Sequence, residues 1–183
     1  MTIHHPSIGP ACPLELGALS LALYGSWTSK FERLGLAVVE DVRFWIPGRP
    51  VPKGRPRAWK SRLVTPKTTR DFEAMVAAAC DRVDVDVPPN LPEIVMGVHV
   101  CAIHRRTGWE MAKKRRDLVV KSRHRSDLDN VAKSVMDGIQ RSRLMVDDSH
   151  VVALDAWRMV APFDAPKLEG ILVGLAWATV VDR

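Results

Sequence analysis

One stretch decides how this chain folds: residues 127–139, with the sequence DLDNVAKSVMDGI. Its apolar positions Val131, Val135 and Ile139 recur every four residues, which places them on one face of an α-helix. Two acids flank the start of that pattern, and Asp129 is a residue type that often caps a helix N-terminus. The sequence therefore predicts a helix that begins near Asp129 and buries one apolar face.

The segments on both sides of this helix predict strands and one more helix. Runs rich in β-branched and aromatic residues, bounded by Pro, Gly or Asp, are typical of strands. Such runs occupy residues 42–46, 62–65, 94–103, 151–160 and 168–181. A further helix is predicted after Thr69, which can serve as its cap. We expect an α/β (α+β) fold, with a mixed sheet of about five strands and two principal helices.

Length and composition limit the class of protein. The chain has 183 residues, 46% of them hydrophobic, which suits one domain with its own core. We expect residues 42–183 to form that domain and residues 1–41 to be an N-terminal extension. The apolar residues 14–23 are too few to cross a bilayer and lack the preceding cations of a signal peptide. Three scattered cysteines fit a reducing compartment, so a cytoplasmic protein is expected.

The chain is basic, with a formal net charge of +6, which favours a polyanionic partner such as nucleic acid. Two segments are densely basic, residues 53–57 and residues 105–125. The candidate phosphate contacts within them are Lys53, Arg55, Arg57, Arg115, Arg116, Lys121, Arg123 and Arg125. The alternative for both segments is a solvated loop that binds nothing.

The acids around the predicted helix form a candidate metal site. Asp127 and Asp129 would project to the same side of an extended backbone, and like charges this close usually need a cation to offset them. Asp147 and Asp148 begin the strand after the helix, where the returning chain could bring one of them beside the first pair. Mg²⁺ prefers such carboxylate ligands. The structural alternative is that Asp129 is a cap and the Asp147-Asp148 pair a turn.

Two more charges continue the acidic motif along the helix. Lys133 lies four residues after Asp129, and Asp137 four residues after Lys133, so all three share one helical face. At this spacing an ordinary surface ion pair contributes only about 0.3–0.5 kcal/mol.

Taken together, these motifs resemble the RusA family of Holliday junction resolvases. The likeness rests on DLDN at residues 127–130, Lys133, Asp137, DDSHV at residues 147–151, IPGRPVPKGRPR at residues 46–57 and Thr65-Pro66. It extends from about residue 42 to the end of the chain. The long N-terminal segment and the basic insert before Asp127 depart from the compact family.

The resemblance implies a Mg²⁺-dependent endodeoxyribonuclease that resolves four-way DNA junctions by paired nicks, in recombination and repair. Mn²⁺ is the expected substitute for Mg²⁺, and a homodimer in a bacterial or phage-infected cell is implied. The implied catalytic residues are the metal ligands Asp127, Asp129 and Asp148 and the cation Lys133. Asp147 is the alternative to Asp148, and Asp137 is expected to support the helix or orient Lys133.

Two other functions stay open from the residues alone. A non-catalytic basic nucleic-acid-binding protein would use the acids only as caps and ion pairs, and would cleave nothing with any divalent metal. An enzyme that uses Mg²⁺ on small phosphorylated substrates is the other alternative, but no P-loop or nucleophile motif supports it. None of the histidines has the spacing of a zinc site.

Overall fold

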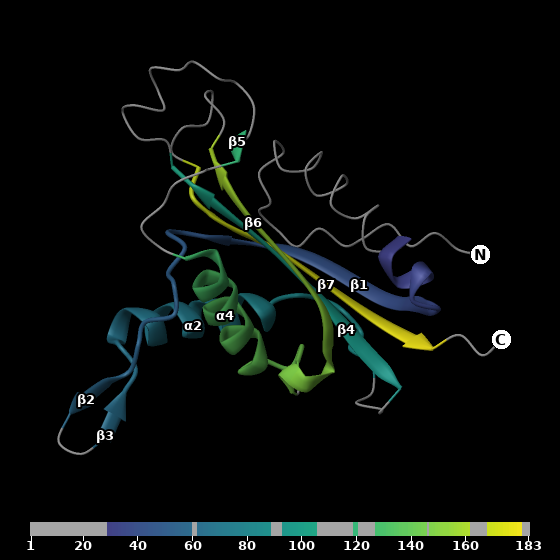
Figure 1. Ribbon diagram of the computed structural model, residues 1–183, viewed down its shortest axis with the longest axis horizontal. Coiled ribbons are helices and arrows are strands. Elements are labelled where there is room, and N and C mark those ends of the chain that lie inside the picture. Colours follow the sequence, from purple (N-terminus) through teal and green to yellow (C-terminus); the bar gives the residue numbers. More distant parts are fainter. Residues whose placement is uncertain are drawn as a thin grey trace.

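The computed structural model describes residues 29–59, 62–88, 93–105, 119–120, 127–145, 147–161 and 168–180. The elements in chain order are β1 (Leu36–Pro47), β2 (Arg57–Trp59), β3 (Arg62–Val64), α2 (Lys67–Cys80), β4 (Ile94–His104), β5 (Val119–Val120), α4 (Leu128–Gln140), the 3₁₀ turn η2 (Asp148–His150), β6 (Val151–Val160) and β7 (Gly170–Val180). The described part is therefore a mixed α+β fold, as the sequence predicts (Figure 1).

Five strands form one mixed sheet in the order β1-β7-β4-β6-β5, and β2 pairs with β3 in a separate hairpin. All neighbours in the large sheet are antiparallel except β4 and β6, which are parallel. β4 lies inside the sheet, and its residues are apolar almost without interruption and largely buried, as expected for a strand covered on both faces. The hairpin projects away from the sheet beside α2 (Figure 1).

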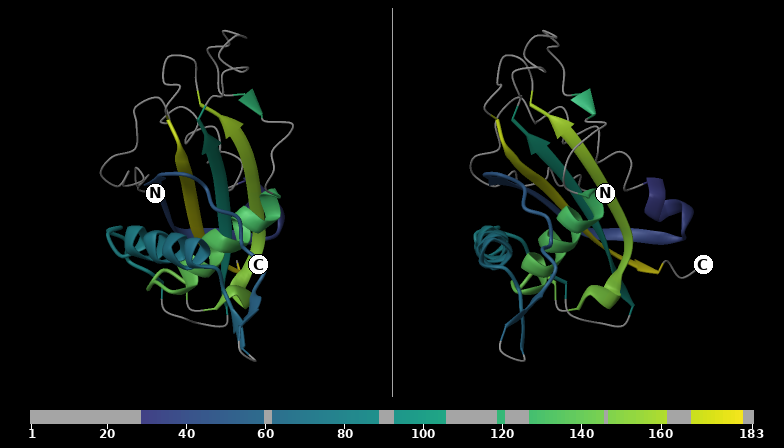
Figure 2. Two further views of the ribbon diagram at one scale, coloured as in Figure 1. Left: turned by 90° about the vertical axis from the view of Figure 1, so that its left-hand side faces the viewer. Right: turned by 60° about the vertical axis from the view of Figure 1, so that its left-hand side comes forward.

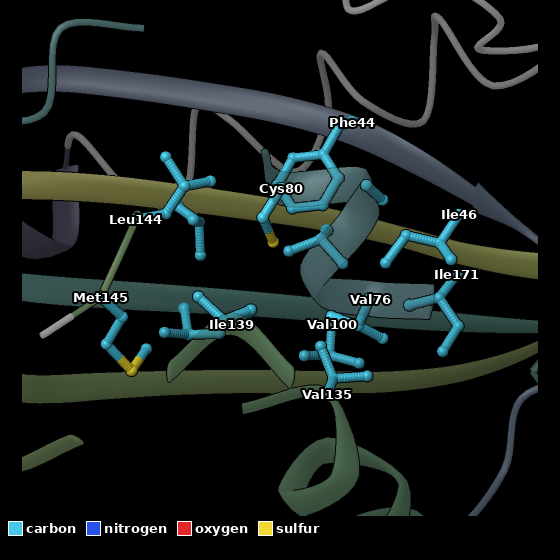
Figure 3. Close-up of a cluster of buried hydrophobic side chains, with 14 of the residues drawn as sticks. Phe44, Ile46, Val76, Cys80, Val100, Val135, Ile139, Leu144, Met145 and Ile171 are labelled. Atoms are coloured by element: carbon cyan, nitrogen blue, oxygen red, sulfur yellow. The ribbon is translucent and has the colours of Figure 1, made fainter. Parts of the chain in front are cut away.

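Helices α2 and α4 cover one face of the sheet (Figure 2). The predicted helical stripe of Val131, Val135 and Ile139 is fully buried there. It packs in one cluster with Val76 of α2 and Val100 of β4 (Figure 3). The apolar face that the sequence predicts is therefore the side of α4 that joins the sheet to α2.

The two helices approach closely at Gly138. A Cβ atom at this position would lie 2.5 Å from the Cβ atom of Val76 and 2.9 Å from the carbonyl oxygen of Glu73. Both distances are shorter than van der Waals contact, so any side chain would push α4 away from α2. Glycine at this position sets the spacing between the helices.

Residues 29–35 pack against the opposite face of the sheet. Phe31 is fully buried and clusters with Ala176 and Ala178 of β7. Lys30 Nζ donates to Asp155 Oδ2 of β6 at 3.1 Å. The predicted domain boundary at residues 41 and 42 falls inside β1, because this strand begins at Leu36.

His99 of β4 is buried on that face, and its Nδ1 atom lies 3.7 Å from Asp155 Oδ2. Burial lowers the pKa of His99 to about 4, although the charge of Asp155 acts in the opposite direction. The imidazole is therefore neutral at pH 7. His99 is therefore a core histidine.

Two candidate helix caps need correction. Helix α2 begins at Lys67 with Pro66 at its N-cap, so Thr69 is not the cap. The Thr69 hydroxyl instead accepts a hydrogen bond from the Gly54 backbone N–H at 3.2 Å. Proline suits this boundary because its ring fixes φ and it has no N–H to satisfy. Helix α4 begins at Leu128, near Asp129 as predicted, but Asp127 and not Asp129 is at the N-cap.

Candidate functional site

The N-terminus of α4 presents two exposed carboxylates. Asp127 is extended at the N-cap and makes no side-chain capping hydrogen bond, and Asp129 lies in the first turn. Asn130 Nδ2 donates weakly to Asp127 Oδ2 at 3.5 Å. The positive end of the helix dipole favours acids here. Because neither carboxylate caps the helix, both remain available to a ligand at the surface.

Lys133 lies one turn further along the same face of α4. Its Nζ atom is 3.7 Å from Asp129 Oδ2, and the two side chains are 64% and 65% exposed. Such an exposed pair contributes at most about 1 kcal/mol to stability. The ammonium group is therefore an exposed cation beside the acid pair and not a part of the core.

The second acid pair has divided roles. Asp147 Oδ1 accepts a hydrogen bond from the Ser149 backbone N–H at 2.7 Å and so caps η2. This hydrogen bond lowers the pKa of Asp147. Asp148 is the first residue of η2 and is exposed. The capping contact occupies Asp147, so Asp148 is the freer carboxylate of the two.

Within one chain, the structure does not bring Asp148 beside the first acid pair. Helix α4 has 13 residues, and at 1.5 Å per residue it is about 20 Å long. Asp127 and Asp129 lie at its N-terminal end, whereas η2 follows its C-terminal end (Figure 1). Among the described residues, no group of three His, Cys, Asp or Glu side chains is placed to hold a metal ion.

A second charged cluster lies between α2 and α4, and the sequence analysis missed it. Lys53 Nζ donates to Glu73 Oε1 at 2.7 Å and also to Asp137 Oδ2. Arg141 lies 2.6 Å from the other oxygen of Glu73, which is fully buried. Asp137 therefore pairs with Lys53 and not with Lys133. One signal was present in the sequence: Glu73 is an acid inside the buried stripe of α2.

The predicted DNA contacts are only partly covered by the described residues. Arg55 is exposed, whereas the ammonium of Lys53 points inward to its two acids. The side chain of Arg57 is outside the described part of the structure. The other predicted contacts, Arg115, Arg116, Lys121, Arg123 and Arg125, also lie outside the described residues.

The exposed acid pair at the start of α4 lies next to the proline-rich segment that carries the exposed cation Arg55. Such an arrangement can hold a divalent cation beside a phosphate group. A family model described as endodeoxyribonuclease RusA matches residues 47–169, about two thirds of the chain. The chain therefore belongs to the RusA family of endodeoxyribonucleases, and the predicted resemblance is confirmed.

One further comparison and one property of the helices complete this description. A search of curated proteins gives no significant match. Among the described residues, no helix is long and apolar enough to cross a membrane.

Proposed function

We propose that this nuclease resolves four-way DNA junctions by paired nicks, with Mg²⁺ as its cofactor, in recombination and repair. The observation that carries the proposal is the exposed pair Asp127 and Asp129 at the start of α4, inside the region that matches the RusA model. A branched DNA is the substrate class, and the exposed cation Arg55 supports binding to its phosphates.

The donor set at α4 suits a hard divalent cation. Mg²⁺ is commonly held by one or two carboxylates together with waters and substrate phosphates. Asp127 and Asp129 would supply the two carboxylates, and Asp148 is the proposed third ligand. When bound, the ion supplies a Lewis acid that stabilises charge developing on the phosphate, and Mn²⁺ is the proposed substitute.

Lys133 has its own role in this proposal. Without a metal, its ammonium group offsets the charge of Asp129 at 3.7 Å. Its exposure leaves it free to turn toward a phosphate oxygen when DNA is bound, where a cation stabilises the negative charge that develops.

We further propose a homodimer in which each site takes Asp148 from the second copy. Two observations support it. Asp148 is separated from the acid pair by the length of α4 (Figure 1). In the described residues, β6 pairs with β4 along one edge, and on its other edge it meets β5 only at Met159 and Val160. Three apolar side chains are exposed on this strand: Val152, Leu154 and Trp157.

The chain direction of α4 and β6 would allow such a dimer to bring Asp148 of one copy to the acid pair of the other. The chain leaves α4 at its C-terminal end, passes through η2 and returns along β6, so the start of α4 lies toward the end of β6 (Figures 1 and 2). Antiparallel pairing of two β6 edges about a two-fold axis would place η2 of one copy near the end of the partner's β6. Asp148 of that copy would then face the partner's acid pair.

A mixing experiment tests this arrangement. Purified Asp129→Asn and Asp148→Asn variants should each be inactive, but their heterodimers should contain one site with all its acids. We expect the mixture, after subunit exchange, to recover single-strand nicking of a labelled four-way junction. A mixture as inactive as its components would refute the shared site. The same mixture made with a doubly substituted Asp129→Asn, Asp148→Asn chain in place of either component is the control.

A further inference from the structure

Lys53 joins three segments through one ammonium group. It lies in the proline-rich segment, and its partners are Glu73 on α2 and Asp137 on α4. Glu73 is fully buried and has a second cation partner, Arg141, at 2.6 Å. An unpaired carboxylate at such a depth would be strongly destabilising, so the buried acid requires its cations.

Backbone hydrogen bonds hold the same segment in place. The Lys53 N–H donates to the carbonyl of Asn130 at 2.7 Å, in the first turn of α4. The Ser134 hydroxyl donates to the carbonyl of Val51 at 2.5 Å. A Cβ atom on Gly54 would lie 2.8 Å from Pro66, so the chain passes very close to the start of α2. Residues 51–54 are therefore fixed between the two helices.

The position of this segment connects two functional parts of the molecule. Asn130 is the neighbour of Asp129 in the acid pair. Four residues after Lys53, the chain enters the β2–β3 hairpin at Arg57, which is a predicted DNA contact. Any shift of residues 51–54 would move the hairpin relative to the acidic start of α4.

Lys53 remains a cation in this environment. Burial acts to lower its pKa, but the hydrogen bonds and charges of Asp137 and Glu73 outweigh it and raise the pKa above its ordinary value. The Lys53 ammonium group thus donates its N–H groups to Glu73 and Asp137. A DNA phosphate would have to compete with both acids for the same three donors.

We propose that Lys53 is a positioning residue and not a phosphate contact: by holding Glu73 and Asp137 it fixes the β2–β3 hairpin relative to Asp127 and Asp129. The inference rests on the proposed junction cleavage for its effect on rate. Removal of Lys53 is then expected to slow the cleavage of DNA that is already bound. Removal of a phosphate contact would instead lower the affinity for DNA and the salt dependence of that affinity.

The salt dependence of binding separates the two roles. Each phosphate contact contributes about 0.9 to the slope of log K against log salt concentration on duplex DNA. We expect Lys53→Met to keep the parent slope in EDTA, while its single-turnover cleavage rate at saturating protein falls at least about tenfold. Arg55→Met is the matched comparison two residues away, and it should lose about 0.9 of the slope.

A compensating variant tests the buried contact directly. Replacing a buried ion pair by apolar residues of similar size can be nearly neutral, whereas removing one partner is not. The double variant Lys53→Met, Glu73→Met should therefore cleave within about threefold of the parent and be less destabilised than the two single effects summed. If Lys53→Met does not fold, the salt slope and the cleavage rate are measured on this double variant and on Lys53→Arg instead.

Three results would overturn the inference: a slope reduced by about 0.9 in the Lys53 variants, an unchanged cleavage rate in folded Lys53→Met, or a double variant as slow as Lys53→Met. Failure of the proposed function is distinguishable. If the parent protein cuts no junction, two measurements remain: the salt slope of DNA binding, and the free energies of unfolding of the parent, Lys53→Met, Glu73→Met and the double variant. Together they still decide whether Lys53 acts through Glu73.

Discussion

Asp129→Asn is expected to reduce cleavage of a four-way junction by on the order of a thousandfold, with junction affinity within about threefold of the parent. The amide keeps the size of the side chain but removes the charge that would hold the metal. Asp129 is exposed in the first turn of α4 and pairs with the equally exposed Lys133, so the substitution should change stability by no more than about 1 kcal/mol. Single-turnover cleavage in Mg²⁺ and binding in EDTA give the two values.

The control for this substitution is Asp81→Asn. Asp81 is an exposed acid at the end of α2 and has no place in the proposed site. It should cleave at the parent rate. If Asp129→Asn turned over at a comparable rate across Mg²⁺ concentrations, its assignment as a metal ligand would be wrong.

Gly138→Ala should destabilise the protein by about 2–4 kcal/mol, which is the largest effect we expect from adding one methyl group. The added Cβ atom would meet Val76 and the backbone of Glu73 at 2.5 and 2.9 Å. A backbone atom cannot move aside as a flexible side chain can, so the two helices must separate. Urea unfolding, with the midpoint and slope fitted together, measures the change.

Two further variants show whether the close approach is the cause. Gln140→Ala lies on the exposed side of the same helix and should change stability by less than about 0.5 kcal/mol. Val76→Ala keeps the Val76 Cβ atom but removes Cγ1, which would lie 2.7 Å from the added Cβ atom. Its combination with Gly138→Ala should therefore cost less than the sum of the two single effects. If the two changes in unfolding free energy simply added, the contact between Gly138 and Val76 would not be the cause of the destabilisation.

The periodic features of the fold were predictable from the sequence. The four-residue spacing of Val131, Val135 and Ile139 correctly predicts the buried face of α4, because helical geometry alone sets it. The strands β4 and β6 were predicted to within about one residue, since their runs of β-branched residues end in clear turn signals. The start of α4 also places the acid pair at the surface, as the motif implies.

Contacts between distant segments were not predictable. Lys53 pairs with Glu73 and Asp137, which are 20 and 84 residues away, and no local pattern encodes such a pair. A Pro-rich run with several cations suggests a DNA-binding loop, but packing against two helices turns one of these cations inward. The separation of Asp148 from Asp129 likewise follows from the length of α4 and the turn after it, which the motif spacing does not show.

The most direct test of the account is incubation of the purified protein with a labelled synthetic four-way junction and a matched linear duplex, each with Mg²⁺ and with EDTA. We predict paired, symmetric nicks in the junction, in Mg²⁺ only, and none in the duplex. Salt-sensitive binding to the junction without cleavage in Mg²⁺ or Mn²⁺ would contradict the account, and would mean that Asp127, Asp129 and Asp148 are structural acids.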